Sequence, residues 1–518
     1  MKKTIFTSFA LFCMSVQGLW AHQLMEVSSV SEQSSTADKV SYIDRRWDDA
    51  SKRVVDMEKV RNKGEYYLLS GNYGDSHLML EDGHWYVVKG DVKASSLIVP
   101  AGGNVFLIIC DGAKLTAPVY FVTEYKQTGV IHIYGQTAGT GKLIAESTSE
   151  YDAGIGGTKK FFHYGPEYNI GGGNVIVYGG DITAKGGEKA PGIGCGDYNG
   201  EVTGGMLRVF GGKITARGGD YAAGIGGAWD GVGADVTVYG GTVIAYGGVD
   251  AAGIGSGEQQ GVSVSAGSLT VYGGKVEGHG GGHGAGIGGG QDGSGAKVIV
   301  YGGDVFGYGG VDAAGIGSGE ETFTMPSSNN GDSYELHGGS LTVYGGHVFG
   351  DGTGWGAGIG GGEDADGAKV EIHGGIVEAW AGADAGKKNG CAIGAEDGDG
   401  HRGSLKLGDK MIVHAGQNPT DAAKHLFPFD TRVPACYFRP YARVEYNGSP
   451  NVVPSFREVC MGKMQNMIET TGIESIDTQN PTVNKQQSCW FTLDGRRLDE
   501  KPTIPGIYIM NGRKITIK

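Results

Sequence analysis

The sequence predicts an all-β chain that folds as a parallel β-helix (solenoid), with an N-terminal cap and a small C-terminal β domain. Three observations lead to this prediction. Glycine accounts for 100 of the 518 residues while proline accounts for 14, a Gly-Ile-Gly triplet recurs along the middle of the chain, and a Val-Tyr-Gly-Gly motif recurs with it. Ordinary proteins contain roughly 7% glycine. A periodic, glycine-rich and proline-poor chain is typical of stacked structural repeats.

The two motifs keep the same rhythm. The triplet, whose last copy is a degenerate Ala-Ile-Gly, is centred on eight isoleucines: Ile155, Ile193, Ile225, Ile254, Ile287, Ile316, Ile359 and Ile393. The second motif places a ring at seven positions: Tyr178, Phe210, Tyr239, Tyr272, Tyr301, Tyr344 and His373. Because both series lengthen at the same copies, the extra residues are loop insertions, and the unit itself is about 29 residues long.

One unit, residues 234–257, predicts three short strands. Residues 235–239 alternate apolar and polar side chains and end at a glycine pair, residues 242–245 continue the pattern, and residues 251–255 contain the triplet. Alternation over four or five residues bounded by glycines indicates strands and turns. A helix is disfavoured because each glycine would cost it roughly 1 kcal/mol.

Three strands joined by glycine corners describe one coil of a parallel β-helix, with coils stacked about 4.8 Å apart. In the unit above, four side chains are expected to point inward and to form apolar columns with their equivalents: Val236, Val238, Val243 and Ile254. The alternative, an antiparallel sandwich or barrel, predicts Asn-Gly or Asp-Gly hairpin turns. The repeat instead keeps one order of three distinct pieces, which favours the solenoid.

The N-terminal residues 1–21 predict a signal peptide, because Lys2 and Lys3 precede a short apolar stretch that ends at Ala21. The protein is therefore expected to be exported, to the outer surface or the extracellular space. No segment reaches the roughly 18 apolar residues of a membrane helix. Residues 22–74 carry no clear pattern beyond a short helix expected over residues 50–60. Residues 75–150 predict cap coils, and residues 151–417 the glycine-rich solenoid.

Removal of the signal peptide leaves six cysteines, and an exported chain permits disulfides. Cys436 and Cys460 form the most local pair outside the repeats. Cys110, Cys195 and Cys391 lie far apart in the sequence, so we expect buried thiols at these positions at least as much as disulfides.

Beyond the repeats the glycine rhythm stops. Residues 418–460 predict one or two strands, residues 461–487 a linker, and residues 488–518 hairpins with Asp-Gly and Asn-Gly turns. The last part, with Gly-Ile-Tyr-Ile at 506–509 and a basic final strand, resembles the C-terminal sorting domain of Bacteroidetes type IX secretion cargo. This resemblance implies recognition by that secretion machinery and a location on or outside the cell.

Residues 83–89, 111–117 and 133–143, followed by the Gly-Ile-Gly repeats, resemble a family of exported glycine-rich repeat proteins of gut bacteria. The resemblance covers roughly residues 80–415. Family members are often labelled carbohydrate-binding, so the resemblance implies the solenoid architecture and an affinity for glycans. It transfers no catalytic residue.

The position directly after the second strand of each unit supplies the candidate ligand-binding residues. We call them the second-strand row: Lys185, Arg217, Tyr246, His279, Tyr308, Asp351 and Trp380. Stacked coils would align them on an exposed edge, with Tyr246 and Tyr308 roughly 9 to 10 Å apart. Two rings at that spacing could stack on alternate sugars or grip a protein side chain. An ordinary solvent-facing edge explains the row equally well.

An acidic residue follows most triplets, and calcium takes oxygen ligands from several loops. The calcium candidates are Asp197, Asp230, Glu258, Asp292 and Glu320. Their offset from the isoleucine drifts from four to five residues, which favours a solvated acidic edge over a cation site. His279 and His283 are four residues apart but not on a helix, so a surface loop is favoured over a shared metal. No other cofactor is expected.

The formal net charge of −14 argues against nucleic acid and slightly favours a cationic protein partner. The chain contains no nucleophile elbow and no zinc-protease motif, and neighbours in the second-strand row form no carboxylate pair. We therefore expect a secreted or cell-surface binding protein that captures an external host protein or glycan. Two alternatives stay open: a polysaccharide-cleaving enzyme on the same scaffold, and a structural adhesin.

Overall fold

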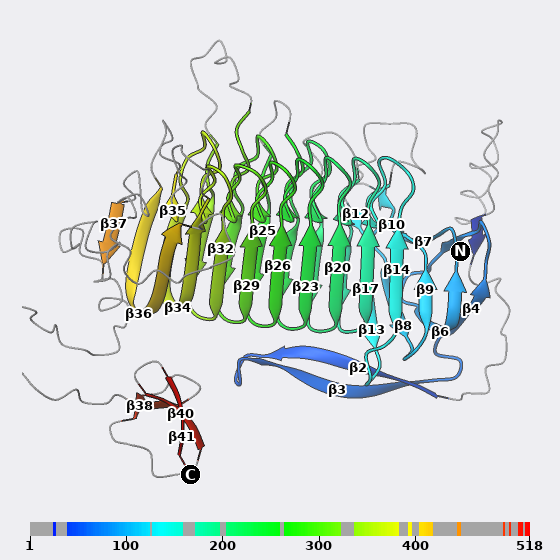
Figure 1. The fold of residues 1–518 in the computed structure, drawn as a ribbon. Helices are drawn as coiled ribbons and strands as arrows, with labels where there is room; N and C mark the ends of the chain where they lie inside the picture. Colours follow the sequence, from blue (N-terminus) through cyan, green and yellow to red (C-terminus); the bar gives the residue numbers. More distant parts are fainter. Residues whose placement is uncertain are drawn as a thin grey trace, which may run out of the picture. The chain divides into compact units, whose positions relative to one another are not determined.

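The structure of the chain is a computed structural model. It describes residues 24–26, 39–124, 127–158, 171–196, 204–259, 264–322, 336–382, 392–395, 403–417 and 443–446, and four strands between residues 490 and 517. By its internal contacts the chain divides into two units, residues 1–471 and 472–518. The first unit is a parallel β-helix (Figure 1), which confirms the predicted fold class.

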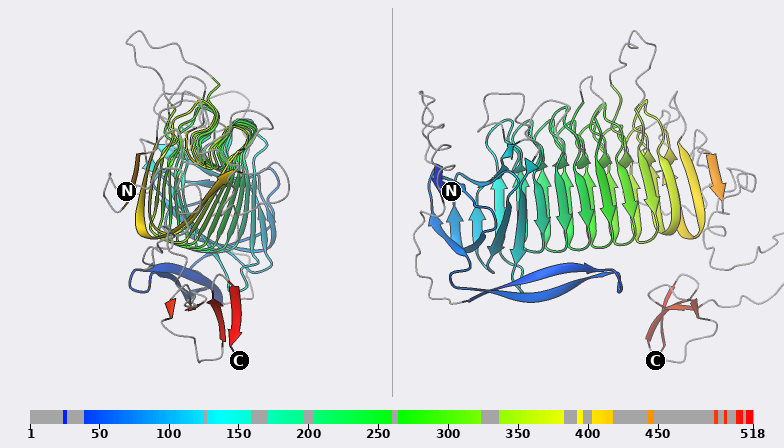
Figure 2. Two further views of the ribbon diagram at one scale, coloured as in Figure 1. Left: turned by 60° about the vertical axis from the view of Figure 1, so that its left-hand side comes forward. Right: turned by 180° about the vertical axis from the view of Figure 1, so that it is seen from behind.

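Each regular coil contains three strands, and strands of one kind pair in parallel from coil to coil, as the superposed coils in Figure 2 show. The first strands are β8 (Asn104–Ile109), β13 (Val130–Gly135), β16 (Asn174–Val177), β19 (Met206–Val209), β22 (Asp235–Val238), β25 (Ser268–Val271), β28 (Lys297–Val300) and β31 (Ser340–Val343). The second strands are β9 (Lys114–Thr116), β14 (Lys142–Glu146), β17 (Asp181–Lys185), β20 (Lys213–Arg217), β23 (Thr242–Tyr246), β26 (Lys275–His279), β29 (Asp304–Tyr308) and β32 (His347–Asp351).

The third strands form a sheet of their own. They are β1 (Leu24–Glu26), β5 (His77–Met79), β7 (Ser96–Val99), β10 (Val119–Phe121), β15 (Ile155–Gly156), β18 (Ile193–Gly194), β21 (Ile225–Gly226), β24 (Ile254–Gly255), β27 (Ile287–Gly288), β30 (Ile316–Gly317), β33 (Ile359–Gly360) and β35 (Ile393–Gly394). At both ends of the stack longer strands replace the first and second strands: β4 (Tyr67–Asn72), β6 (Trp85–Lys93), β34 (Lys369–Ala381) and β36 (Ser404–Gln417). The two remaining pieces of this unit's solenoid are β37 (Arg443–Tyr446), paired with β36, and a small ribbon of β11 (Thr123–Glu124) and β12 (Gln127–Thr128).

The apolar columns predicted from one unit are the core. Val236, Val238, Val243 and Ile254 are each at most 3% exposed. Ile254 pairs directly with the isoleucines of the coils before and after it. Equivalent residues at every height join into one continuous hydrophobic cluster. Since a single coil cannot bury its own inner face, the stability of the stack comes from contacts between neighbouring coils.

The second glycine of each triplet has a steric reason. From Gly156 to Gly394 these glycines have φ between 135° and 155°. A Cβ atom built on Gly156 through Gly360 would lie 1.7 to 2.0 Å from the carbonyl oxygen of the equivalent glycine in the next coil. No side chain fits there, so this column keeps the third wall of the solenoid thin.

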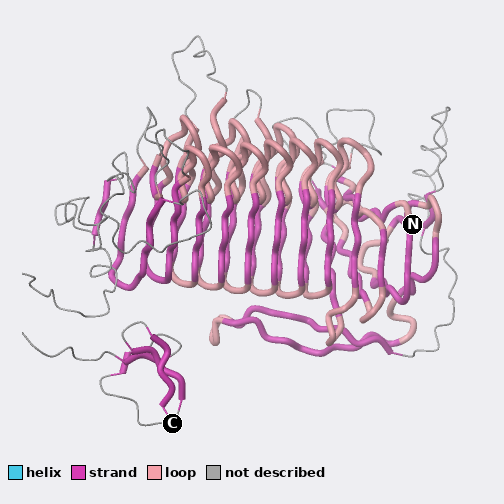
Figure 3. The backbone as a smooth tube through the Cα atoms, viewed as in Figure 1, coloured by secondary structure: helices cyan, strands magenta, loops and turns pink. Residues whose placement is uncertain are grey.

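The expected helix over residues 50–60 is wrong. The chain forms instead an antiparallel hairpin of β2 (Lys39–Asp48) and β3 (Arg53–Asn62), in which all ten residues of each strand are paired. Val54, Val55 and Val60 favour a strand because β-branched side chains pack well on a pleated surface. The hairpin lies along the edge of the solenoid where the short turns between first and second strands gather, whereas longer loops occupy the opposite edge (Figure 3).

The second unit contains β38 (Trp490–Thr492), β39 (Arg497–Leu498), β40 (Gly506–Met510) and β41 (Arg513–Ile517) in an antiparallel sheet of order β39-β38-β40-β41. β40 and β41 are joined through Asn511-Gly512, which confirms the predicted hairpin. In the first unit, Cys110 and Cys195 are buried; the other five cysteines lie outside the described residues. No helix in the described ranges is long and apolar enough to cross a membrane.

Candidate functional site

The structure aligns the seven residues of the second-strand row. Consecutive members are Cα partners in neighbouring coils from Lys185 to Trp380. The parallel register follows directly from the repeat, because each residue keeps the same offset from the glycine pair of its own coil. Sequence therefore predicted the column correctly.

The surface of this row differs from the expected one. The Arg217 guanidinium lies 4.0 Å from the Tyr246 ring centroid. His279 is stacked on both sides, 4.7 Å from the ring of Tyr246 and 4.7 Å from that of Tyr308. The imidazole thus fills the space predicted for a ligand between the two tyrosines. Asp351 and Trp380, expected on an exposed edge, are buried at 9% and 6% exposure.

The Val-Tyr-Gly-Gly motif builds a second column at the corner between first and second strands. We call it the aromatic ladder: Tyr134, Tyr178, Phe210, Tyr239, Tyr272, Tyr301, Tyr344 and His373. Successive ring centroids are 4.3 to 5.4 Å apart, and their planes are within 12° of parallel. This spacing is close to the distance between paired strands, so the backbone register imposes the stacking.

The hairpin covers about half of the ladder. At one end Tyr42 packs 4.9 Å from Tyr134. At the other end Trp47 packs 5.5 Å from Tyr239 and 5.2 Å from Tyr272. Aromatic pairs in tilted or edge arrangements add roughly 0.5–1.5 kcal/mol each beyond the area they bury.

The first glycine of the Val-Tyr-Gly-Gly motif leaves room for the side chains of the hairpin. A Cβ atom on Gly179 would lie 2.7 Å from Nη1 of Arg45, and one on Gly240 would lie 3.2 Å from Cγ2 of Val54. The Arg45 guanidinium also donates a hydrogen bond to the carbonyl oxygen of Tyr178, directly before Gly179. The flat glycine corners therefore let hairpin side chains rest against the backbone of the solenoid.

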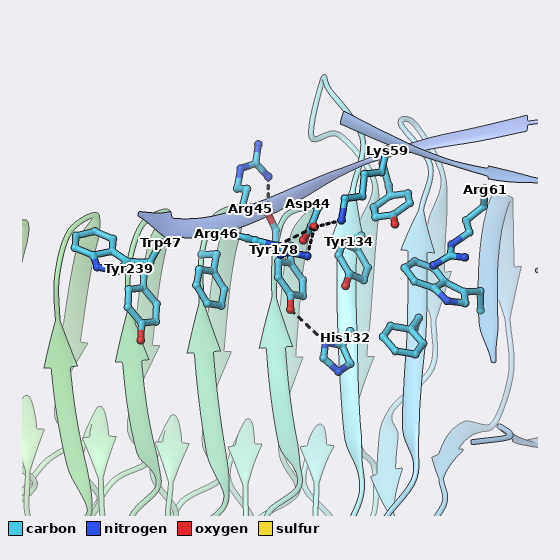
Figure 4. Close-up of a pocket in the computed structure, with 14 residues that line it drawn as sticks. Asp44, Arg45, Arg46, Trp47, Lys59, Arg61, His132, Tyr134, Tyr178 and Tyr239 are labelled. Atoms are coloured by element: carbon cyan, nitrogen blue, oxygen red, sulfur yellow. Dashed lines mark hydrogen bonds and ion pairs between the residues drawn. The ribbon is translucent and has the colours of Figure 1, made fainter. Parts of the chain in front are cut away.

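Between the hairpin and the solenoid lies a cavity of about 650 Å³, the ladder cleft (Figure 4). This volume is within the usual range for ligand pockets, roughly 300–1,000 Å³. The hairpin contributes Tyr42, Asp44, Arg45, Arg46, Trp47, Lys59 and Arg61. The solenoid contributes Trp85, Phe106, His132, Tyr134, Tyr178, Phe210 and Tyr239.

Cations outnumber anions in the lining by four to one. The Asp44 side chain, 6% exposed, pairs with Arg46 at 3.0 Å and with Lys59 at 2.6 Å. Arg61 lies 3.8 Å above the Trp85 ring centroid. Its Nε atom is buried and finds no hydrogen-bond partner within the described residues. The cleft therefore offers surplus positive charge together with a buried donor that an anionic ligand could satisfy.

The aromatic side of the cleft carries no charge near neutral pH. Burial lowers the pKa of His132, which favours its neutral form, and His132 Nδ1 lies 3.3 Å from the Tyr178 hydroxyl oxygen. Burial raises the pKa of Tyr134 and of Tyr178, so both phenols stay protonated. Charge is thus confined to the hairpin, and a ligand would meet cations on one side and rings on the other.

Of the five calcium candidates, Asp197 lies outside the described residues. The backbone N–H of Asp230 donates to the carbonyl oxygen of Glu258, and that of Asp292 to the carbonyl oxygen of Glu320, so each aspartate lies beside the glutamate of the next coil. The Asp292 carboxylate accepts hydrogen bonds of 2.7 and 2.9 Å from Thr322. Among the described residues, Glu320 is the one calcium candidate that belongs to a group of three acidic side chains close enough to share a cation.

Glu320 instead meets two residues that sequence reasoning did not select. Carboxylate oxygens of Asp312, Glu320 and Glu363 lie within 4.8 Å of one another, and we call this group the carboxylate cluster. Three carboxylates at this separation could hold a hard cation such as calcium. His283 borders the cluster, with Nδ1 2.7 Å from Asp250 and Nε2 3.6 Å from Glu320. His279 belongs to the second-strand row, so the two histidines do not share a site.

The carboxylate cluster is expected to make folding stability pH-dependent. Burial raises the pKa of Glu320 to about 7, and the charges of Asp312 and Glu363 act in the same direction while His283 opposes them. Burial works against protonation of His283, but its hydrogen bond to Asp250 and the Glu320 charge raise its pKa overall. The folded state thus holds the Glu320 proton more tightly than the unfolded chain, whose carboxyl titrates near pH 4.5.

Glu320 should therefore contribute stability that is complete below pH 4.5 and is lost as the pH rises through about 7. We expect Glu320→Gln to flatten the decline of the urea unfolding midpoint over this window. Glu146→Gln, at an exposed position of β14, is the matched control and should leave the decline unchanged. Equal pH profiles for Glu320→Gln and the unmodified protein would contradict the expectation.

Sequence reasoning identified the ladder only as a repeat and missed the hairpin. The available signal was the aromatic or imidazole ring in each of the seven Val-Tyr-Gly-Gly copies. Rings repeated at every corner indicate a surface that packs against something, whereas a corner exposed to solvent does not require them. Nothing in residues 39–62 has the period of the repeat, so their position over the ladder could not be read from it.

Three stretches of the chain, residues 175–197, 210–229 and 236–258, match a family model described as the beta helix repeat. They contain strands of three successive coils, in agreement with the parallel pairing of β16 through β24. No curated protein and no solved structure matches the chain. The comparisons support the coil architecture and assign no activity.

Proposed function

We propose that the protein is an exported binding protein that captures an external macromolecule, and that the ladder cleft binds an acidic glycan. The observation that carries the proposal is the lining of the cleft: four cations and one anion on the hairpin, facing uncharged rings on the solenoid. Carboxylate or sulfate groups would pair with the cations. The apolar faces of the sugars would pack on the edges of the aromatic side chains, because the ring faces are stacked on one another.

The net charge of −14 would by itself repel a polyanion. At physiological ionic strength, however, charges are screened over about 8 Å. Within the cleft the four cations therefore outnumber the acidic residues that pair with them, which are Asp44 in the lining and Asp56, 3.1 Å from Arg45. The signal-like N-terminus, the sorting-like C-terminal strands and the resemblance to carbohydrate-binding repeat proteins support an exported glycan-binding role.

Arg61 provides the sharpest test, because among the cleft cations it packs on a ring and leaves a buried donor without a partner. We expect uronic acid or sulfated oligosaccharides to bind in isothermal titration calorimetry, and neutral oligosaccharides of equal length to bind much more weakly. Arg61→Gln should weaken binding roughly tenfold, consistent with about 1.4 kcal/mol for a charged hydrogen bond. Raised salt should weaken it further.

Arg53→Gln is the matched control, since Arg53 lies exposed at the opposite end of the same strand. Its affinity should equal that of the unmodified protein. Equal affinity for neutral and acidic oligosaccharides, an unaffected Arg61→Gln variant, or tight binding of an acidic peptide in preference to every glycan would each refute the assignment.

A further inference from the structure

The aromatic ladder continues beyond the hairpin. Trp47 reaches Tyr272, and the hairpin turns back at residues 49–52. The next two rungs, Tyr301 and Tyr344, remain in the stack at 4.8 and 5.0 Å but are 46% and 50% exposed. Nearby Ile376 is 38% exposed. Single exposed apolar side chains are ordinary, but neighbouring ones that form a contiguous patch indicate an interaction surface.

The glycine corners beyond the hairpin have the same backbone shape as the corners that the hairpin covers. Above Gly179 and Gly240 an added Cβ atom would strike side chains of the hairpin. Above Gly302 and Gly345 it would meet only the carbonyl of the preceding ladder tyrosine, about 2.8 Å away. The solenoid therefore repeats the surface that binds the hairpin, two coils further along, and no side chain of the described ranges lies on the Gly302 and Gly345 corners.

The contacts of the hairpin show which chemistry fits this surface. The faces of the ladder rings are stacked on one another, so a partner can reach only the ring edges. At the corners a partner can reach the backbone carbonyl oxygens. The hairpin makes one contact of each kind. The Arg45 guanidinium donates a hydrogen bond to the Tyr178 carbonyl oxygen. The Trp47 ring packs against Tyr239 and Tyr272 with its plane tilted by 42° and 46° to theirs. A partner segment with an arginine and an aromatic side chain could make the same two kinds of contact with the uncovered rungs.

We propose that Tyr301, Tyr344 and the Gly302 and Gly345 corners bind an extended segment of a partner polypeptide that carries an arginine and an aromatic residue, extending the interface made by the chain's own hairpin. The formal net charge of −14 favours approach of such a basic segment. This interface is separate from the glycan proposed for the ladder cleft, and either assignment can fail without the other.

The probe is a fluorescein-labelled peptide with the sequence of residues 39–62, added to the full-length protein and followed by fluorescence anisotropy. We expect saturable binding that weakens at least tenfold in a Tyr301→Ser, Tyr344→Ser double variant. A Tyr301→Phe, Tyr344→Phe variant keeps the ring edges and should retain binding. A Val249→Ser, Val311→Ser variant is the matched control, because both valines are exposed, at 53% and 56%, and lie away from the ladder.

A peptide in which the residues corresponding to Arg45 and Trp47 are replaced by serine should bind at least tenfold more weakly. Far-UV circular dichroism melts confirm that each variant keeps the solenoid. The proposal is overturned if the peptide does not bind, or if the double tyrosine variant binds it as well as the unmodified protein does. The second result would mean that the peptide displaces the resident hairpin or attaches elsewhere.

Discussion

Gly255→Ala is expected to destabilise the solenoid by roughly 4 kcal/mol or more, a cost typical of severe steric conflict in a packed structure. Gly255 has φ of 147°, and its added methyl group would lie 1.8 Å from the carbonyl oxygen of Gly288. That oxygen belongs to the rigid backbone of the next coil, so the conflict is relieved only by separating two coils. The measurement is urea unfolding followed by far-UV circular dichroism.

Because stability is a sum over neighbouring coils, a break in the middle of the stack should also divide the unfolding transition into two steps. Gly139→Ala is the control. Gly139 also has a positive φ, 65°, but a Cβ atom there would meet nothing within 4 Å. Its expected cost is the conformational one alone, about 1–2 kcal/mol. Similar losses for the two variants would refute the role given to the triplet column.

Asp44→Ala is expected to release the hairpin from the solenoid while leaving the coils folded. The buried Asp44 carboxylate pairs with Arg46 and Lys59. Without it, these cations face Arg45 and Arg61 with no opposite charge in the cleft lining. Breaking a fully buried ion pair costs about 3–5 kcal/mol; since Arg46 and Lys59 are 64% and 40% exposed, we expect about 2 kcal/mol.

A loss of this size should raise hydrogen exchange of the backbone amides in residues 39–62 by roughly 30-fold, with little change in the coils. Glu58→Ala is the control, because Glu58 lies at an exposed position of β3. It should leave exchange unchanged, since surface substitutions away from buried contacts have small effects. If Asp44→Ala left the hairpin amides equally protected, Asp44 would not be what holds the hairpin in place.

The repeats allowed the sequence to predict residues that lie far apart along the chain but adjacent in space. The isoleucines of the triplets are about 30 residues apart, yet their pairing followed from the period alone. The same reasoning aligned the second-strand row correctly. It could not show that His279 fills the gap between Tyr246 and Tyr308, because ring orientation depends on rotamers and neighbours as well as on register.

At its C-terminal end the second-strand row is buried, because the loops around each coil differ. Asp351 and Trp380 occupy the same position in the coil as Lys185 and Arg217. Lys185 and Arg217 are exposed at the ends of their strands. Asp351 and Trp380 are buried. A repeat predicts that residues are equivalent in the coil. It does not predict how the loops around each coil cover them.

From its period, its glycine pairs and its alternating valines, the sequence alone determined the coil, the order of the three strands and the inward-facing residues. Only the tertiary structure decided where the hairpin lies, and with it the ladder cleft and the uncovered rungs, and only the tertiary structure brought the solenoid loops of the carboxylate cluster together. The physical reason is that register between identical units is imposed by repeated backbone hydrogen bonds, whereas a non-repeating segment is positioned by individual side-chain contacts. Tyr42, Trp47 and Asp44 make those contacts with no periodic relation to the rings and corners that they meet.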